Sequence, residues 1–144
     1  MVRELKETAL IPVVPFKNCP IRTSLGILGK KWTMLILRDI GFLKIGRFNQ
    51  ILRTIPGLTP RVLSMRLREL EESGFIRQIE VQSAPKSVKW GLTDKGRDTL
   101  PILMSFIAFG SRWYSDLVFE DKRPRTPQQL FPRRVVYESV IKNI

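Results

Sequence analysis

The segment Ile55-Pro56-Gly57-Leu58-Thr59-Pro60 constrains the fold of this chain more than any other stretch. Its first proline disfavours helix at the preceding residue, and its glycine tolerates the positive φ that a sharp turn often needs. Thr59 suits a helix N-cap, and Pro60 suits the first helical position. The sequence therefore predicts that a short helix over residues 47–54 and a longer helix over 60–73 meet across a tight turn.

Two further helices are predicted before this pair. Pro20 fits the first turn of a helix over residues 20–28, which Gly29 ends. Apolar residues at helical spacing predict another helix over 31–43.

A β-hairpin and a long helix are predicted after the pair. Two β-rich stretches, 76–81 and 88–92, flank a polar loop over 82–87. The helix that follows begins after Thr93–Asp94 and extends to about Phe119, and Pro101 is expected to kink or split it.

This order of elements is that of a winged helix-turn-helix protein, mainly α with a small β-hairpin (α+β). In that fold the second helix of the pair normally enters the major groove of DNA, and the hairpin extends along the backbone. A small α+β domain without nucleic-acid function has the same element types and stays the alternative fold.

The chain divides into three predicted parts. Residues 1–18 are expected to form an irregular N-terminal arm, and residues 19–119 the DNA-binding and dimerisation domain. Residues 120–144 form a basic, Pro-containing C-terminal tail. Within it, 121–132 is linker-like, and 135–144 is expected to form a short helix or strand.

The net charge indicates the class of partner. The chain has 25 Lys and Arg against 13 Asp and Glu, a net charge of +12. Eight of the excess charges lie in residues 21–70 and four in 121–144. A polyanion is the expected partner, double-stranded DNA ahead of a membrane surface. The longest apolar stretch, Leu100–Gly110, is much shorter than the ~20 residues of a spanning helix, so we expect no membrane partner.

Helical periodicity selects the candidate DNA-reading side chains. If Leu63, Leu67 and Leu70 form the buried stripe of the second helix, its first residues and the opposite side face DNA. The residues predicted there are Thr59, Pro60, Arg61, Ser64, Met65 and Arg68. Arginine bonds either a guanine edge or a phosphate, and methionine packs on a thymine methyl.

Other basic residues have different predicted roles. Arg47 at a helix start and Lys86 and Lys89 beside the hairpin loop are predicted to contact phosphate. Arg66 falls beside the buried stripe, so an ion pair inside the domain, with a glutamate partner, is preferred over a phosphate contact. For Met65 an ordinary exposed or core methionine is an equal alternative.

Enzymatic function is not expected. The sequence contains no histidine and one cysteine, Cys19. This excludes histidine-based catalysis, histidine metal ligation and an intrachain disulfide. No catalytic residue, cofactor or metal site is predicted. With one thiol and no export signal in the sequence, we expect a cytoplasmic location.

The long C-terminal helix is predicted to form a dimer interface. Apolar residues form two rows along this helix: Ile102, Phe106, Phe109 and Trp113 in one, and Leu103, Ile107 and Tyr114 in the other. Together they expose more apolar surface than a small domain can easily cover, and a two-fold contact would bury the excess. The alternative is burial within one monomer. The predicted interface residues are Ile102, Leu103, Phe106, Phe109 and Trp113.

Several short strings together carry a specific resemblance. The chain contains, in order, Cys19-Pro20, Gly29-Lys30-Lys31-Trp32-Thr33, Gly46-Arg47-Phe48, Ile55-Pro56-Gly57-Leu58-Thr59, Arg66-Leu67-Arg68-Glu69-Leu70-Glu71-Glu72-Ser73-Gly74 and Leu92-Thr93-Asp94-Lys95-Gly96. Over about residues 17–114 it resembles the HxlR-type winged helix-turn-helix transcriptional regulators, which are related to the MarR type. The family's hairpin tends to carry Pro-Pro-Arg, where this chain has Pro85-Lys86-Ser87.

The resemblance implies a cytoplasmic homodimer that binds an inverted-repeat operator through sequence-specific contacts. In the family, the N-terminal helix and the long C-terminal helices form the dimer, and some relatives use a cysteine at the position of Cys19 to sense oxidants or electrophiles. A structural cysteine is the alternative for Cys19. The effector is not specified. Two alternative functions stay open: a non-specific architectural DNA-binding protein, and a winged-helix module that docks on an acidic protein.

Overall fold

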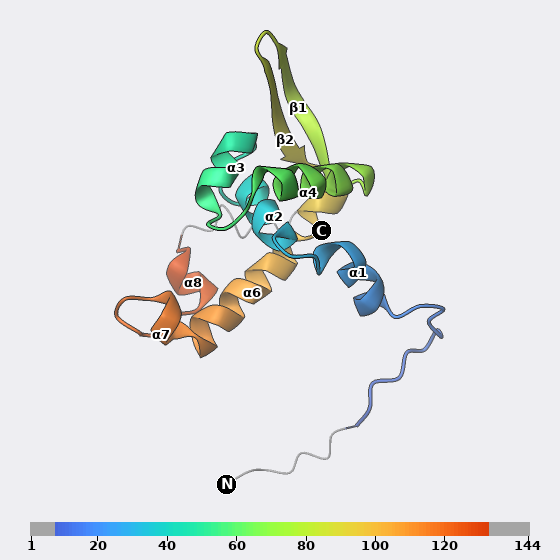
Figure 1. Ribbon diagram of the computed structural model, residues 1–144. Helices are drawn as coiled ribbons and strands as arrows, with labels where there is room; N and C mark the ends of the chain where they lie inside the picture. Colours follow the sequence, from blue (N-terminus) through green and yellow to red (C-terminus); the bar gives the residue numbers. More distant parts are fainter. Residues whose placement is uncertain (1–7, 133–144) are drawn as a thin grey trace.

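The computed structural model describes residues 8–132 of the chain (Figure 1). The elements in the described part are α1 (Pro20–Leu28), α2 (Thr33–Gly41), α3 (Phe48–Thr54), α4 (Pro60–Glu72), β1 (Ile76–Ser83), β2 (Lys86–Leu92), α5 (Asp94–Arg97), α6 (Leu100–Trp113), α7 (Ser115–Val118) and α8 (Pro127–Leu130). The fold is a winged helix-turn-helix, mainly helical with one antiparallel hairpin, as predicted. The predicted terminal element over 135–144 lies outside the described residues.

The turn between α3 and α4 forms as its sequence predicts. The Thr59 hydroxyl accepts a hydrogen bond from the Val62 N–H at 3.3 Å, and Pro60 occupies the first turn of α4. Gly57 has φ +88°, and a β-carbon added there would lie 3.1 Å from the Trp32 ring. The positive φ therefore favours glycine at this position, and any larger residue would also press against the Trp32 ring.

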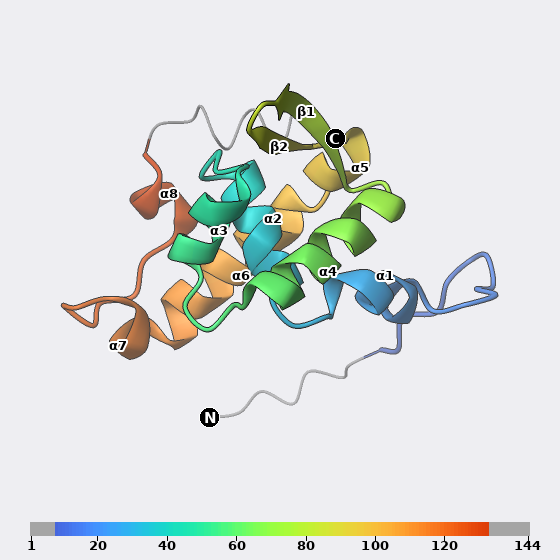
Figure 2. The same ribbon diagram turned by 45° about the horizontal axis from the view of Figure 1, so that its top comes forward.

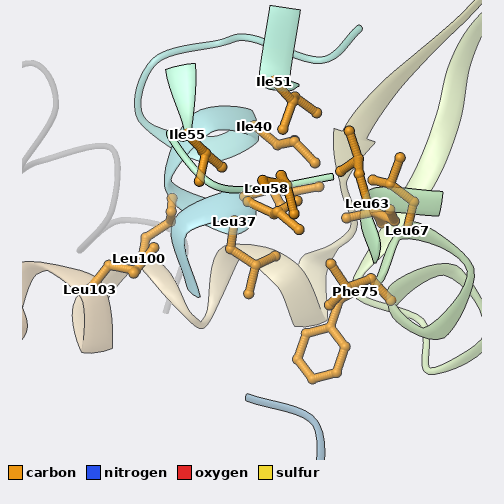
Figure 3. Packing of buried hydrophobic residues seen from close by; sticks show 14 residues of the cluster. Leu37, Ile40, Ile51, Ile55, Leu58, Leu63, Leu67, Phe75, Leu100 and Leu103 are labelled. Carbon is orange, nitrogen blue, oxygen red and sulfur yellow. The ribbon is translucent and has the colours of Figure 1, made fainter. Parts of the chain in front are cut away.

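Most of the core lies between α2 and the helices packed around it. Figure 3 shows Leu37 and Ile40 of α2 amid side chains from the other elements. Leu63, Leu67 and Leu70 of α4 are all buried, which confirms the predicted stripe. Because this stripe fixes the rotation of α4 about its axis, it also fixes which side of the helix faces solvent.

The hairpin is longer than predicted. The β1–β2 ladder continues through the pairs Gln82↔Ser87 and Ser83↔Lys86, so only Ala84 and Pro85 form the turn. The predicted loop over 82–87 was wrong. Its polar residues resemble a loop in composition, but they are paired through the backbone on an exposed hairpin where no core demands apolar side chains.

The predicted C-terminal helix is interrupted twice. The split near Pro101 is confirmed, since α5 ends at Arg97 and α6 begins at Leu100. The predicted continuation to Phe119 was wrong, because Tyr114 leaves the helical region with φ −121° and ψ 31°. In the predicted linker, α8 forms one turn, in which Thr126 and Gln129 make a capping box.

The elements are arranged with two distinct ends. In Figure 1 the hairpin rises above α3 and α4, while α1, α6 and α7 lie on the other side of the molecule. Figure 2 turns the end with α3, α4 and the hairpin toward the viewer. No helix in residues 8–132 has both the length and the apolar character to cross a membrane.

Candidate nucleic-acid interface

The solvent side of α4 carries the predicted DNA-reading residues. Arg61, Ser64 and Arg68 are exposed, and Met65 is 46% exposed. Within residues 8–132, neither Arg61 nor Arg68 makes a hydrogen bond or ion pair. Thr59 and Pro60 are exposed at the N-terminus of the same helix. This side of α4 is thus cationic, and the structure leaves its arginines available to an external anion.

Arg66 lies beside the core stripe and is bound within the domain. Its Nη1 lies 3.2 Å from Glu69 Oε1, and its Nε donates to the Lys31 carbonyl at 2.9 Å. Lys30 Nζ lies 3.1 Å from the same Glu69 oxygen. The predicted ion pair of Arg66 is confirmed, and these contacts fix α4 to the loop between α1 and α2.

Arg47 contacts the middle and outer part of the hairpin. Its guanidinium donates to Ser87 Oγ at 2.7 Å and to Glu80 Oε2 at 2.8 Å. Its backbone pairs with Lys89 in an isolated antiparallel bridge. The sequence predicts Arg47 at a helix start, and the structure places it at the N-cap of α3. Its contacts with Ser87 and Glu80 could not be predicted from the sequence, because they depend on the tertiary position of the hairpin, the wing of this fold.

Gly46 allows this close approach of the backbones. Its carbonyl accepts from the Trp90 N–H at 2.8 Å, and a β-carbon added at Gly46 would lie 2.3 Å from the Trp90 carbonyl oxygen. Residues 46–47 therefore run beside β2 and form one antiparallel bridge with it, which fixes the position of the hairpin relative to α3.

A groove of about 870 Å³ lies between α3, α4 and the hairpin. Its polar and charged lining residues are Arg47, Asn49, Gln50, Arg53, Ser64, Arg68, Glu71, Gln78, Lys86 and Ser87. Arg47, Ser64, Arg68 and Lys86 were predicted DNA contacts, and the structure brings them to one groove. Asn49, Gln50 and Arg53 were missed, although the burial of Ile51 implies that its neighbours on α3 face outward.

Lys89 faces a separate hollow. This hollow, of about 370 Å³, also has Lys44, Arg77 and Arg97 on its walls. Arg97 is paired with Asp94 at 2.5 Å. Lys86 follows the turn directly, whereas Lys89 pairs with Glu80 lower on the hairpin, so the two lysines lie on different parts of the wing.

The other end of the molecule carries an apolar row on α6. Ile102, Phe106, Phe109 and Trp113 are 43%, 62%, 56% and 64% exposed. Leu103 differs from the other predicted interface residues, since it is 6% exposed and packs in the monomer core. Ile21 and Leu25 of α1 add exposed apolar side chains on the same side.

Cys19 lies where the arm meets the first helix. It is exposed and occupies the N-cap position of α1 without a side-chain capping bond. Residues 8–132 contain no group of three or more Cys, Asp or Glu side chains placed to hold a metal ion.

A family model described as HxlR-like helix-turn-helix matches residues 27–117, more than half of the chain. The chain belongs to this family. The matched range contains α2, α3, α4, the hairpin and α6. It therefore includes both the end with the exposed arginines of α4 and the hairpin, here called the cationic end, and the end with the exposed row of α6, here called the apolar end. As a member of this family, the chain is an HTH-type transcriptional regulator and not an enzyme.

Individual relatives agree with this assignment. The HTH-type transcriptional regulator YdzF of Bacillus subtilis strain 168 is 34% identical over 94 residues, which cover 65% of this chain and 86% of YdzF. The reduced form of the transcriptional regulator YodB from B. subtilis gives a TM-score of 0.55 at 28% identity, covering 67% of this chain and 94% of YodB. YodB is also known in a diamide-treated form. The redox regulator HypR in its oxidised form gives 0.57 at 33% identity, covering 64% of this chain and 94% of HypR.

Proposed function

We propose that this HxlR-like regulator binds double-stranded DNA sequence-specifically, as a homodimer on an inverted-repeat operator in the cytoplasm. The observation that supports this most strongly is the exposed side of α4, where Arg61 and Arg68 have no partner within residues 8–132. Exposed, unpaired arginines on the second helix of a helix-turn-helix are suited to the major groove.

Each part of the cationic end has a proposed role. Arg61 reads a base edge or holds a phosphate, and Met65 contacts a thymine methyl. Ser64 and Arg68 contact DNA from the wall of the groove between α3, α4 and the hairpin. The exposed N-terminus of α4 at Thr59 and Pro60 suits a phosphate. Lys86 near the wing tip and Lys89 lower on the hairpin contact the backbone, while Arg47 holds the wing in place for them.

The apolar end supports the proposed homodimer. Four large side chains of α6 stay 43–64% exposed in the monomer, and α1 contributes Ile21 and Leu25 beside them. A two-fold contact of α1 and α6 would bury these residues and present two α4 helices to successive turns of DNA.

A charge on the apolar row tests this dimer. We expect Phe106→Asp to give a monomer by light scattering at micromolar concentration, because the carboxylate would have to lose its hydration in the contact. Leu43→Asp is the matched control, since Leu43 is 52% exposed and does not line the apolar hollows. A wild-type protein that is monomeric, or a dimer unaffected by Phe106→Asp, would contradict the proposed interface.

The DNA-binding proposal is tested by fluorescence anisotropy over a salt series. The logarithm of the binding constant should fall linearly with the logarithm of the salt concentration, with a slope of about −0.9 per neutralised phosphate. Operator DNA should bind more tightly than random DNA. Equal affinity for both would instead indicate an architectural DNA-binding protein. No binding even at low salt would indicate a module that docks on an acidic protein.

Cys19 supports a second proposal, that the regulator responds to oxidants. Its thiol is exposed at the N-cap of α1, and the redox regulator HypR and diamide-treated YodB are similar in fold and sequence. Since the sequence has one cysteine, a disulfide at Cys19 cannot form within one copy and needs a thiol from another molecule. Diamide should change the DNA affinity of the wild type but not of Cys19→Ser, and identical behaviour of the two proteins would contradict this role.

A further inference from the structure

The arm before α1 carries a second set of exposed apolar side chains. In the segment Ala9–Phe16, Leu10, Ile11 and Val13 are 98%, 84% and 101% exposed. Val14 and Phe16 are also largely exposed. Figures 1 and 2 show this part of the chain leading away from the helical body, and the exposed fractions show that the rest of residues 8–132 covers these side chains very little. Five large apolar side chains exposed within eight residues are unusual for a surface that faces water.

The backbone of the arm is suited to an extended conformation. Pro12 and Pro15 interrupt the segment, and residues 8–19 contain no helix or strand. Proline disfavours helix and lacks an N–H, so the arm has fewer donors that need a partner when it is buried. An apolar surface with few polar groups is therefore suitable for it.

The apolar end of the domain contains such a surface. One hollow of about 610 Å³ lies between α1, α2 and α6, and a second of about 460 Å³ lies between α2, α6 and α7. Met34, Leu35 and Phe106 line both hollows, so the two are adjacent. We call this combined surface the apolar trough. Phe42, Ile107 and Val118 line its far part, beside α7.

We propose that the arm of one copy, residues Ala9–Phe16, lies in the far part of the apolar trough of the second copy. This inference rests on the proposed homodimer and names a contact within it. The arm lies outside the family match at residues 27–117, so it adds an interaction specific to the N-terminal part of this chain.

Continuity of the chain selects the second copy as the occupant. The arm runs directly into α1, whose Pro20, Ile21 and Leu25 border the near part of the trough. If α1 of the second copy covers that near part, the arm before it enters the far part. Within its own monomer the arm leaves the trough open and stays exposed.

The length of the arm fits this path. Eight extended residues reach about 26 Å, and the fourteen residues of α6 span about 21 Å. An extended arm is therefore long enough to cover the far part of the trough on the partner. Polar contacts are few there, since Arg38, which lines the far part, is already bonded to Asp39 at 2.8 Å.

Photo-crosslinking between two tagged forms of the full chain tests the proposal. One form carries a benzophenone amino acid in place of Val13, the other carries only a different tag, and the two are co-expressed. We expect crosslinks from Val13 to the other copy, mapped by mass spectrometry to residues 34–42 or 106–118. A crosslink within the same copy, or none to the trough, would overturn the proposal. The same probe in place of Leu43 is the control and should give no crosslink to the trough.

A paired measurement separates this proposal from the homodimer itself. By analytical ultracentrifugation, Val13→Ser/Val14→Ser should raise the dimer dissociation constant about tenfold or more, and Leu43→Ser should leave it unchanged. If the wild type is a dimer and the double variant dimerises equally well, the arm contact is wrong and the homodimer stands. If the wild type is a monomer, both fail.

Discussion

Arg66 and Arg68 are two positions apart on α4 and have opposite surroundings. Arg66 bonds Glu69 and the Lys31 carbonyl, whereas Arg68 extends from the exposed side without a protein partner in the described residues. The difference follows from helical geometry, because a step of two residues turns the side chain by about 200°. One arginine therefore positions the helix, and the other is available to DNA.

Arg61→Ala tests base reading at the start of α4. If Arg61 bonds a guanine edge, the variant should lose about 1–3 kcal/mol of binding free energy on the operator and much less on random DNA. Lys86→Ala is the comparison and should weaken binding to all sequences alike and flatten the salt slope. Anisotropy titrations on both DNAs measure these effects. Equal losses on both DNAs for Arg61→Ala would assign Arg61 to phosphate.

Thr33→Val tests a buried hydroxyl in the core. Thr33 is 1% exposed, and its Oγ1 has no hydrogen-bond partner within residues 8–132. Replacing this hydroxyl by a methyl should raise the free energy of unfolding by about 1 kcal/mol in urea titrations. Thr54→Val is the matched control and should lower it by about 1 kcal/mol or more, since the Thr54 hydroxyl donates to the buried carboxylate of Asp39. A loss of stability in Thr33→Val would mean that its hydroxyl is satisfied in solution.

At the level of elements, the wing is held by contacts that are distant in sequence. Arg47 bonds Ser87 and Glu80, and the Gly46 carbonyl accepts from Trp90. The hairpin itself contributes little to the core, since along β1 only Ile76 is buried. Its orientation relative to α4 therefore depends on this junction.

Gly46→Ala should displace the base of the wing. The new β-carbon would lie 2.3 Å from the Trp90 carbonyl oxygen. Because that oxygen is part of the backbone, the clash can be relieved only if the backbone of residue 46 or of β2 moves. We expect a loss of about 1–3 kcal/mol in unfolding free energy and weaker DNA binding. Gly26→Ala is the control, because a β-carbon there meets nothing within 4 Å and alanine favours helix. Unchanged stability and DNA affinity in Gly46→Ala would show that the junction does not position the wing.

The turn after α7 provides a prediction on pH. The Arg125 guanidinium, at 2.8 Å, and the Arg123 N–H lower the pKa of Asp121 from its ordinary 3.8 to about 2. A lowered carboxyl pKa means that the contact contributes fully above pH 3.8 and is lost as the pH falls through about 2. NMR titration of the Asp121 carboxyl carbon should show this low value, and Arg125→Ala should return it toward 3.8. An ordinary pKa in the wild type would contradict the ion pair.

The elements differ in how well the sequence predicts them. Helix boundaries around the 55–60 turn follow from local proline, glycine and threonine preferences, and the face of α4 follows from periodicity. The ladder pair Gln82↔Ser87 could not be predicted, because it lies on an exposed hairpin without an apolar pattern. Leu103 could not be separated from the exposed row of α6, because neighbouring apolar rows are distinguished only by what packs against them.

At the level of the whole molecule, the two ends differ in surface chemistry and have different proposed roles. The cationic end combines α3, α4 and the wing, and the apolar end combines α1, α6 and the apolar trough. Lys30, Lys31, Glu69 and Arg66 connect the α1–α2 loop to α4. The surface proposed for dimer formation is thereby coupled through direct contacts to the helix proposed to read DNA.

Selection of bound sites from fragmented genomic DNA tests the central proposal most directly. We expect the wild-type protein to enrich one inverted repeat with half-sites about one helical turn, 10–10.5 base pairs, apart. Arg61→Ala should enrich the same repeat less strongly or with relaxed preference at one position of each half-site. Recovery of no common sequence, or of a single unrepeated half-site, would contradict a sequence-specific homodimer.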